Sequence, residues 1–392
     1  MAEHSGVAAG AGAGVGGDPD AAVTAALADV RAQVGGGPVT LAVVFLGSGY
    51  ARHAERVRAA VADALGPQVL LGVVSAGVIA GGAELESPDS VVVWAAILPG
   101  AVVTPLRYPP AGLADAPTSW AAPPEDTAGL VLLADPSTFP TEAFTRWVDH
   151  LHPGMPVSGA LSSGSTQASD ARLLLDGEVL TDGAVAVALG GAVALTPLVS
   201  QGCKPIGEPF TVTRGERNVI AELGGEPAME RIRQVTAEAD PADRQRLQEG
   251  LLIGLAVEEF RDHHGVGDFL VRPVVGADRE RGAVAIGERV QLGQTVQLHV
   301  RDADTADRDL RRTLASAWEH PPHAALLFTC TARGSALFAA PDHDAGLVRE
   351  ALGDVALAGC FAAGEVGPVG GRNHVHTFTA SLLVVHSRAA PL

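Results

Sequence analysis

Three short apolar segments of this chain end in the same glycine spacing, Gly-x4-Gly. The glycine pairs are Gly72 and Gly77, Gly159 and Gly164, and Gly359 and Gly364. Each pair follows a predicted strand and a predicted helix, begins within a second predicted strand, and is followed by further strands. Because glycine accepts positive φ and lets another backbone approach closely, these corners are expected to be tight turns or sites. The recurring order predicts one supersecondary unit that is used repeatedly.

The units are defined by where the apolar period changes. The first has strands over 41–45 and 70–74 around a helix over 50–65. The second covers 129–133, 141–152 and 155–160, and the third covers 324–328, 342–352 and 356–361. A fourth candidate, with strands over 251–257, 268–275 and 283–300, lacks both the helix and the glycine spacing.

The predicted fold class is α+β. A chain of 392 residues exceeds what one hydrophobic core usually serves, so we expect two domains. Each would contain two related strand-helix-strand-strand units, with mixed, largely antiparallel sheets packed together and helices outside. We expect a disordered Gly/Ala tail over 1–17, a first domain over 18–198 and a second over 199–392.

Charge and cysteine content limit the partners and the compartment. The balance of 27 basic against 45 acidic residues gives a net charge of −18, which repels nucleic acid and anionic lipid. We therefore expect neither a nucleic-acid nor a membrane partner. No basic segment precedes an apolar core at the N-terminus, and three cysteines are too few for a disulfide framework. A cytoplasmic location is expected.

The segment 360–376 concentrates unusual groups. Glu365 follows Gly364 inside an apolar stretch, and His374 and His376 are two residues apart on a predicted strand, so they share a face. Cys360 and Asn373 belong to the same segment. One interpretation is a polar pocket floor in which these groups hold an ammonium, a hydroxyl or a metal. The other is a turn with structural hydrogen bonds and half-exposed histidines.

A second group of candidates ends the strand at 324–328. Arg333 could present its planar fork to a carboxylate, with the Cys330 thiol beside it. Alternatively, Arg333 pairs with a structural acid and Cys330 is a small buried hydrophobe. A cysteine nucleophile with a histidine base also remains open.

The remaining candidates follow the predicted domain boundary. Cys203 and Lys204 lie in a loop closed by glycines and proline, which exposes one cation, and Arg272 lies in an apolar strand. The loop does not match a phosphate-binding loop, since the Gly-x4-Gly-Lys-Ser/Thr order is absent.

Several motifs together resemble the FIST family, the F-box and intracellular signal transduction proteins. They include Gln201 to Gly207 with the sequence Gln-Gly-Cys-Lys-Pro-Ile-Gly, the run from Phe269 to Arg272, and the run from Gly364 to His376. Weaker N-terminal matches are Val74 to Ile79 and Asp182 to Leu189. The resemblance covers residues from about 38 to the C-terminus.

The resemblance implies a sensory module that binds a small ligand, with amino acids as candidates, and signals through a separate partner protein. An amino acid needs a cation for its carboxylate and an acid for its ammonium, and Arg333 and Glu365 supply both. We expect no cofactor and no metal, and a non-enzyme more readily than an enzyme. A thiol- or metal-dependent hydrolase and an interaction scaffold without a small ligand are the alternatives.

Overall fold

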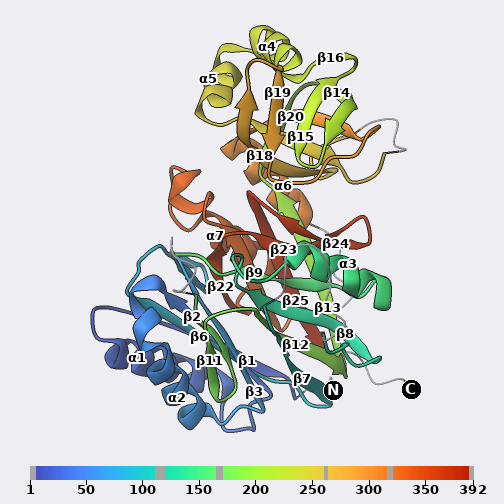
Figure 1. Ribbon diagram of the computed structural model, residues 1–392. Coiled ribbons are helices and arrows are strands. Elements are labelled where there is room, and N and C mark those ends of the chain that lie inside the picture. Colours follow the sequence, from blue (N-terminus) through green and yellow to red (C-terminus); the bar gives the residue numbers. More distant parts are fainter. Residues whose placement is uncertain (1–5, 111–119, 165–170, 260–263, 316–320, 388–392) are drawn as a thin grey trace. The chain divides into compact units, whose positions relative to one another are not determined.

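The computed structural model describes residues 6–110, 120–164, 171–259, 264–315 and 321–387, in two compact units (Figure 1). Unit 1 comprises Met1–Val199, Arg311–Val375 and Thr379–Leu392, and unit 2 comprises Ser200–Leu310 and His376–Phe378. Unit 2 begins at Ser200, whereas the second domain was predicted to begin at residue 199. The chain then returns to unit 1 at Arg311, so most of the segment after residue 310 belongs with the N-terminal half.

Unit 1 contains three six-stranded sheets. In spatial order, the first consists of β1 (Ala8–Val15), β6 (Ser90–Ile97), β2 (Leu41–Gly47), β3 (Val69–Ser75), β10 (Leu173–Leu175) and β11 (Glu178–Leu180). The second consists of β7 (Ala101–Tyr108), β12 (Ala184–Gly191), β8 (Thr127–Ala134), β9 (Val157–Leu161), β23 (Glu365–Val369) and β24 (Arg372–His376). The third consists of β13 (Val193–Gln201), β25 (Thr379–Ser387), β21 (Ala324–Cys330), β22 (Ala356–Ala362), β4 (Val78–Ala80) and β5 (Ala83–Leu85).

The three sheets have one topology. Each centres on a parallel pair, β2 with β3, β8 with β9, and β21 with β22. A helix connects the strands of each pair: α2 (Ala54–Leu65) after the 3-10 turn Ser48–His53, α3 (Thr141–Leu151), and α7 (His343–Leu352). Parallel neighbours need such a crossover. The predicted α+β class is confirmed, but the predicted two units per domain are not found, because all three copies lie in unit 1.

The hairpin that follows each parallel pair joins a different sheet. The hairpin β4–β5, which follows β3, pairs with β22, and β10–β11, which follows β9, pairs with β3. The hairpin β23–β24, which follows β22, pairs with β9. The three sheets are therefore interlocked in a cycle.

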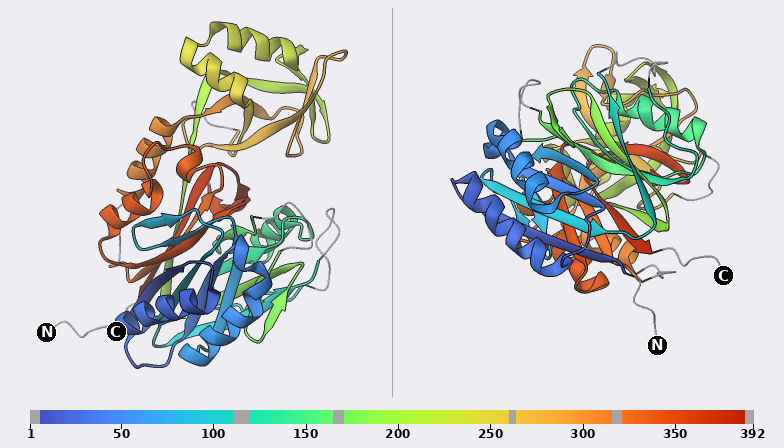
Figure 2. Two further views of the ribbon diagram at one scale, coloured as in Figure 1. Left: turned by 90° about the vertical axis from the view of Figure 1, so that its left-hand side faces the viewer. Right: turned by 90° about the horizontal axis from the view of Figure 1, so that it is seen from below.

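The inner faces of the three sheets share one core. Phe45, Trp94, Val131, Phe328 and Leu383 are all buried in a single apolar cluster. The outer face of the first sheet is covered by α1 (Pro19–Val34) and α2, drawn in blue in Figures 1 and 2. The outer face of the second sheet is covered by α3. Helices on the outside agree with the prediction.

The N-terminal Gly/Ala segment is a correction to the sequence analysis. Residues 8–15 form β1, an antiparallel neighbour of β6, although residues 1–5 lie outside the described part of the chain. A Cβ on Gly12 would lie 2.1 Å from the carbonyl oxygen of Ala26 in α1, and one on Gly14 would lie 1.9 Å from that of Ala22. The glycines therefore let α1 pack directly on the strand. The prediction of disorder was based on composition alone, so it did not take into account that the glycines of this strand allow a helix to pack closely against it.

The Gly-x4-Gly spacing is explained by the same kind of close approach. The first glycines, Gly72, Gly159 and Gly359, are each paired in register with the neighbouring parallel strand. A Cβ at these positions would lie 2.6, 1.8 and 1.7 Å from the carbonyl oxygens of Val44, Leu132 and Leu327, respectively. The three spacings therefore mark equivalent positions.

The three corners that follow these glycines are joined by hydrogen bonds. Ser163 Oγ accepts from the Ala76 backbone and donates to the Phe361 carbonyl, and the Phe361 N–H donates to Gly77. Ser162 Oγ donates to the Val74 carbonyl. The glycine corners predicted from sequence thus meet at one place in unit 1.

Unit 2 is a closed antiparallel barrel. Its strands are β14 (Cys203–Glu216), β20 (Thr295–Arg301), β17 (Leu252–Ala256), β18 (Phe269–Asp278), β19 (Ala283–Ile286) and β15 (Val219–Leu223). Pairing of β15 with β14 closes the ring. The short strand β16 (Glu226–Pro227), α4 (Ala228–Glu238) and α5 (Pro241–Glu249) follow β15, and α6 (Ala303–Leu314) follows β20. In the described residues no helix has the length and apolarity needed to cross a membrane.

Candidate functional site

A cluster of buried charged groups lies at the third corner of unit 1. Arg333, Asp344 and Glu365 each have fully buried side chains. Arg333 follows β21, Asp344 is the second residue of α7, and Glu365 begins β23 after the glycine corner. Charged side chains are seldom buried without partners, so the site is defined by how each charge is compensated.

The guanidinium of Arg333 is held by Asp344. Its Nε donates to Oδ2 at 2.7 Å and its Nη2 donates to Oδ1 at 2.8 Å. This bidentate geometry is the strongest pairing available to an arginine. Of the two predicted partners of Arg333, a ligand carboxylate or a structural acid, the structure shows the structural acid, Asp344.

Asp344 collects further donors. Thr329 Oγ1 donates to its Oδ2 at 2.6 Å, and His343 Nδ1 lies 2.9 Å from its Oδ1. Burial alone would raise the pKa of Asp344, but the charge and hydrogen bonds of Arg333 outweigh it and hold the pKa well below its usual range. Asp344 is therefore ionised and, with Arg333, forms a neutral buried pair.

Glu365 is in a different state. Thr379 donates to its Oε2 from the backbone at 3.2 Å and from Oγ1 at 2.8 Å. Its Oε1 is buried and has no hydrogen-bond partner among the described residues. Burial raises the pKa of Glu365 to about 8, although Thr379, Arg333 and Cys330 partly oppose the shift. At neutral pH this carboxyl group is mostly protonated.

A hairpin from the first repeat closes the same corner. Glu84 of β5 accepts the N–H groups of Asp344 and Ala345 at 2.8 and 3.0 Å. These are orphan donors of the first turn of α7. Burial, with the nearby charge of Asp344, raises the pKa of Glu84 to about 7 despite these two donors. The corner therefore carries two carboxyl groups whose charged forms are poorly compensated.

Cys360 at this corner is poorly suited to form a thiolate. Cys330 and Cys360 are both buried. Burial raises the pKa of the Cys360 thiol well above its usual value, and the charge of Glu365 adds to the shift, although Ser75 opposes it. A thiol held in this way is a weak nucleophile, since the thiolate is the reactive form.

The structure brings together five of the predicted site residues. Arg333, Glu365 and Cys330 interact electrostatically, and Cys360 is affected by Glu365. Gly364 lies beside them, and its carbonyl accepts from Leu161 N–H at 2.8 Å. These residues all belong to unit 1.

Two further predicted residues of unit 1 lie on β24. Asn373 has a structural role: it donates to Asp149 and to the Met155 carbonyl and accepts the Val157 N–H, at 2.6 to 2.9 Å. This amide thus ties β24 to α3 and β9. His374 is half-buried on the same strand.

The remaining predicted site residues belong to unit 2. His376 is buried at the end of β24. Lys204 is ion-paired with Asp243 at 2.6 Å, and Arg272 with Glu288 at 3.2 Å. Cys203 packs in a small apolar cluster of the barrel. Each of the two cations therefore already has an acidic partner.

Asp344, Thr379 and Glu84 were not predicted from the sequence. An acid in the first turn of a helix is usually an exposed cap, so Asp344 gave no local signal. Thr379 and Glu84 reach the corner through long-range strand pairing. In the described parts of the chain, no group of three or more His, Cys, Asp or Glu residues is arranged to hold a metal ion.

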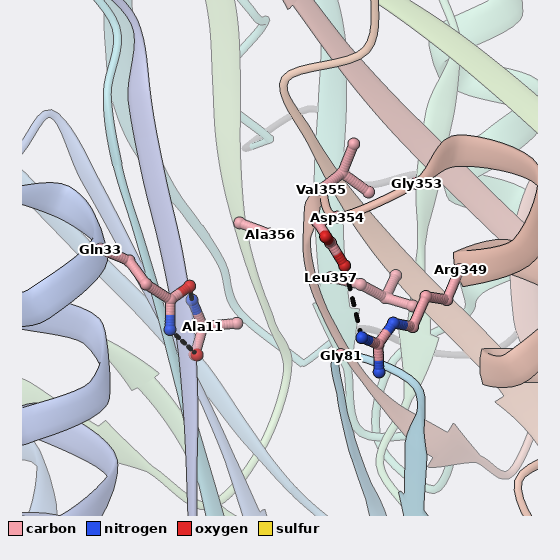
Figure 3. Close-up of a pocket in the computed structure, with 9 residues that line it drawn as sticks. All are labelled: Ala11, Gln33, Gly81, Arg349, Gly353, Asp354, Val355, Ala356 and Leu357. Atoms are coloured by element: carbon pink, nitrogen blue, oxygen red, sulfur yellow. Dashed lines mark hydrogen bonds and ion pairs between the residues drawn. The ribbon is translucent and has the colours of Figure 1, made fainter.

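A separate cavity of about 230 Å³ lies between β1 and the segment from α7 to β22 (Figure 3). On one wall, the Gln33 side-chain amide pairs with the backbone of Ala11. On the other wall, Arg349 pairs with Asp354 at 3.3 Å. None of the predicted site residues lines this cavity.

Comparison with known proteins identifies the family. The chain matches the FIST N domain over residues 40–226 and the FIST C domain over residues 228–368. The chain belongs to the FIST family. The FIST C match spans segments of both compact units, so the family domains and the units divide the chain differently.

The similar full-length relatives are mycobacterial. This FIST protein is 41% identical to the uncharacterized protein Rv0628c of Mycobacterium tuberculosis H37Rv, over 95% of this chain and 98% of the relative. It is 39% identical to the uncharacterized protein Mb0898c of Mycobacterium bovis, over 95% and 97%. Among solved structures, a cyanuric acid hydrolase from A. caulinodans aligns over 98% of this chain and 100% of that one, at 10% identity and a TM-score of 0.34. That score is too low to support a conclusion.

Proposed function

We propose that this FIST protein is a sensory module that binds a small ligand at the buried carboxyl group of Glu365 and signals through a separate protein. The observation that carries the proposal is Glu365 Oε1, which is buried without a hydrogen-bond partner among the described residues. Buried polar atoms are nearly always satisfied. A ligand that donates a hydrogen bond would complete this site.

The charge balance of the corner selects the kind of donor. Arg333 and Asp344 cancel each other, which leaves the carboxyl groups of Glu84 and Glu365 with raised pKa values. A cationic amine would stabilise their charged forms. An amino acid is one such ligand, with its ammonium group at Glu365. Its carboxylate would need donors other than Arg333 Nε and Nη2, which Asp344 occupies.

Calorimetric titration of the full chain with the common amino acids and simple alkylamines tests the proposal. Because Glu365 is mostly protonated at neutral pH, binding of an ammonium group should release close to one proton. Titrations in two buffers of different ionisation enthalpy measure that release. Glu365→Gln should abolish both the binding and the proton release.

Glu86→Gln is the matched control, because Glu86 lies near the same corner but bonds to Ser335. It should leave the affinity unchanged. Dissociation constants no tighter than about millimolar for every compound, or equal affinity and equal proton release in Glu365→Gln, would show that the assignment is wrong.

A further inference from the structure

A second concave surface lies in unit 2, on the outer side of the barrel. It is a groove of about 910 Å³ between the hairpin of β14 and β15 and the hairpin of β18 and β19. These two hairpins are joined by pairing of β15 with β19, at Val219 with Ala285 and Ile220 with Val284 (Figure 1). Ile220, Val284 and Ile286 point into the barrel core. The alternate residues therefore face the groove.

The floor of the groove is made of small side chains. They are Gly215, Ala221, Gly276, Ala277, Ala283 and Ala285. Without bulky side chains, another extended backbone can lie close to the sheet. Val219, which also lines the groove, is 36% exposed. The floor thus offers apolar contact along an extended line.

Three arginines form the rim. Arg214 pairs with Glu222 at 3.1 Å, and Arg281 pairs with Asp278 at 3.8 Å, in positions where the arginine side chains are 65% and 85% exposed. Such exposed pairs are easily exchanged for a ligand carboxylate. Arg217 is exposed at positive φ in the β14–β15 turn, and its side chain has no partner in the described parts of the chain.

Three arginines and two acids, Glu216 and Asp278, line the groove, and the partner of Arg214, Glu222, is not among the lining residues. The chain as a whole has a net charge of −18. An anionic ligand is therefore favoured locally, while a long polyanion would be repelled by the remaining surface. The volume of the groove is about 910 Å³, which is about four times the 230 Å³ of the cavity in Figure 3.

We propose that this arginine-rimmed groove docks an extended acidic segment of a partner protein. The peptide backbone lies along the small-residue floor, and its carboxylates meet Arg214, Arg217 and Arg281. This groove would provide the partner contact that the proposed sensory function requires. The biological purpose of the contact rests on that proposed function, but the docking itself does not. The groove lies in unit 2, whereas Glu365 lies in unit 1. Peptide binding to the groove can therefore be tested without a small ligand at Glu365.

Fluorescence anisotropy of the full chain with a labelled decapeptide of alternating glutamate and serine tests the proposal. Binding is expected at low salt and should weaken as salt rises. Arg217→Ala should weaken it about fivefold, Arg217→Lys should retain most of it, and combined alanine substitution of the three arginines should abolish it. Arg233→Ala is the control, since Arg233 is 72% exposed on α4 of the same unit, and it should leave binding unchanged.

Two further probes decide between partner classes. A decapeptide with lysine in place of glutamate and a ten-nucleotide thymidine oligomer should both bind more weakly than the acidic peptide. Equal binding of the two peptides, unchanged binding by the triple variant, or tighter binding of the oligonucleotide that depends on the same arginines would overturn the proposal.

Discussion

The first and third repeats of unit 1 have the same topology, but the acidic residue of the crossing helix is exposed in the first and buried in the third. In both, a glycine of the second strand sits against a carbonyl of the first, at Gly72 and at Gly359. The second residue of the crossing helix is acidic in both, but Glu55 in α2 is 64% exposed and pairs with Arg58, whereas Asp344 in α7 is 1% exposed and pairs with Arg333. The shared topology thus explains why both repeats have a glycine at this position. Whether the helix acid belongs to a buried charged site depends on how far its surroundings are buried.

The largest expected difference between the two repeats is the effect of neutralising that acid. Asp344→Asn leaves the Arg333 charge buried without its counter-ion, and breaking a buried pair in this way costs about 3–5 kcal/mol. Glu55→Gln, the matched change in α2, should cost less than about 1 kcal/mol because the pair is exposed. Urea denaturation of the full chain measures both. A loss for Asp344→Asn as small as that for Glu55→Gln would remove the contrast.

The glycines should respond in the same direction but to different degrees. A Cβ would lie 1.7 Å from a carbonyl oxygen at Gly359 and 2.6 Å from one at Gly72. We expect Gly359→Ala to destabilise by about 3 kcal/mol and Gly72→Ala by about 1 kcal/mol, the range found for overpacked sites. Thermal unfolding compares them. Equal destabilisation by the two substitutions would contradict this prediction and would mean that the backbone adjusts to the added Cβ to the same extent at both glycines.

The two repeats should also differ in the pH dependence of stability. Burial raises the folded-state pKa of Glu365 from 4.5 to about 8 and that of Glu84 to about 7. The folded protein therefore keeps protons that the unfolded chain has lost, and stability should fall as pH rises between about 5 and 8. Glu365→Gln should flatten this decline.

Glu55 supplies the control for the pH series. Its hydrogen bond to Arg58 lowers its pKa, so its contribution is lost only as pH falls through the acid range. Glu55→Gln should leave the slope between pH 5 and 8 unchanged. Denaturation midpoints at several pH values test this, and an unchanged slope in Glu365→Gln would contradict the assignment of that carboxyl group.

Local sequence patterns predicted the elements of unit 1 but not their assembly. The apolar period located β2, α2 and β3 to within a few residues. The exchange of hairpins between sheets has no local signal, so the third repeat was assigned to a separate domain. The alternating glycines of β1 were misread because their function depends on a helix that packs against them.

For the site, sequence identified the charges but not their partners. Glu365 and Arg333 were recognised because charged groups in apolar surroundings need compensation. That Asp344 neutralises Arg333 and leaves Glu365 incompletely satisfied depends on the approach of α7 to β21 and on Thr379 from β25. Such distances arise from tertiary packing and have no signature in spacing.

The cyclic exchange of hairpins also bears on synthesis of the protein by the ribosome. The hairpin β4–β5 emerges early, but its partner β22 begins only at Ala356. Likewise β9 lacks its outer neighbour until Glu365 has been translated. A nascent chain that ends after the FIST N segment therefore exposes unpaired strand edges, which are prone to aggregate. Neither family segment expressed alone should yield a soluble, folded protein. The sheets of unit 1 can be completed only when the C-terminal strands have left the ribosome.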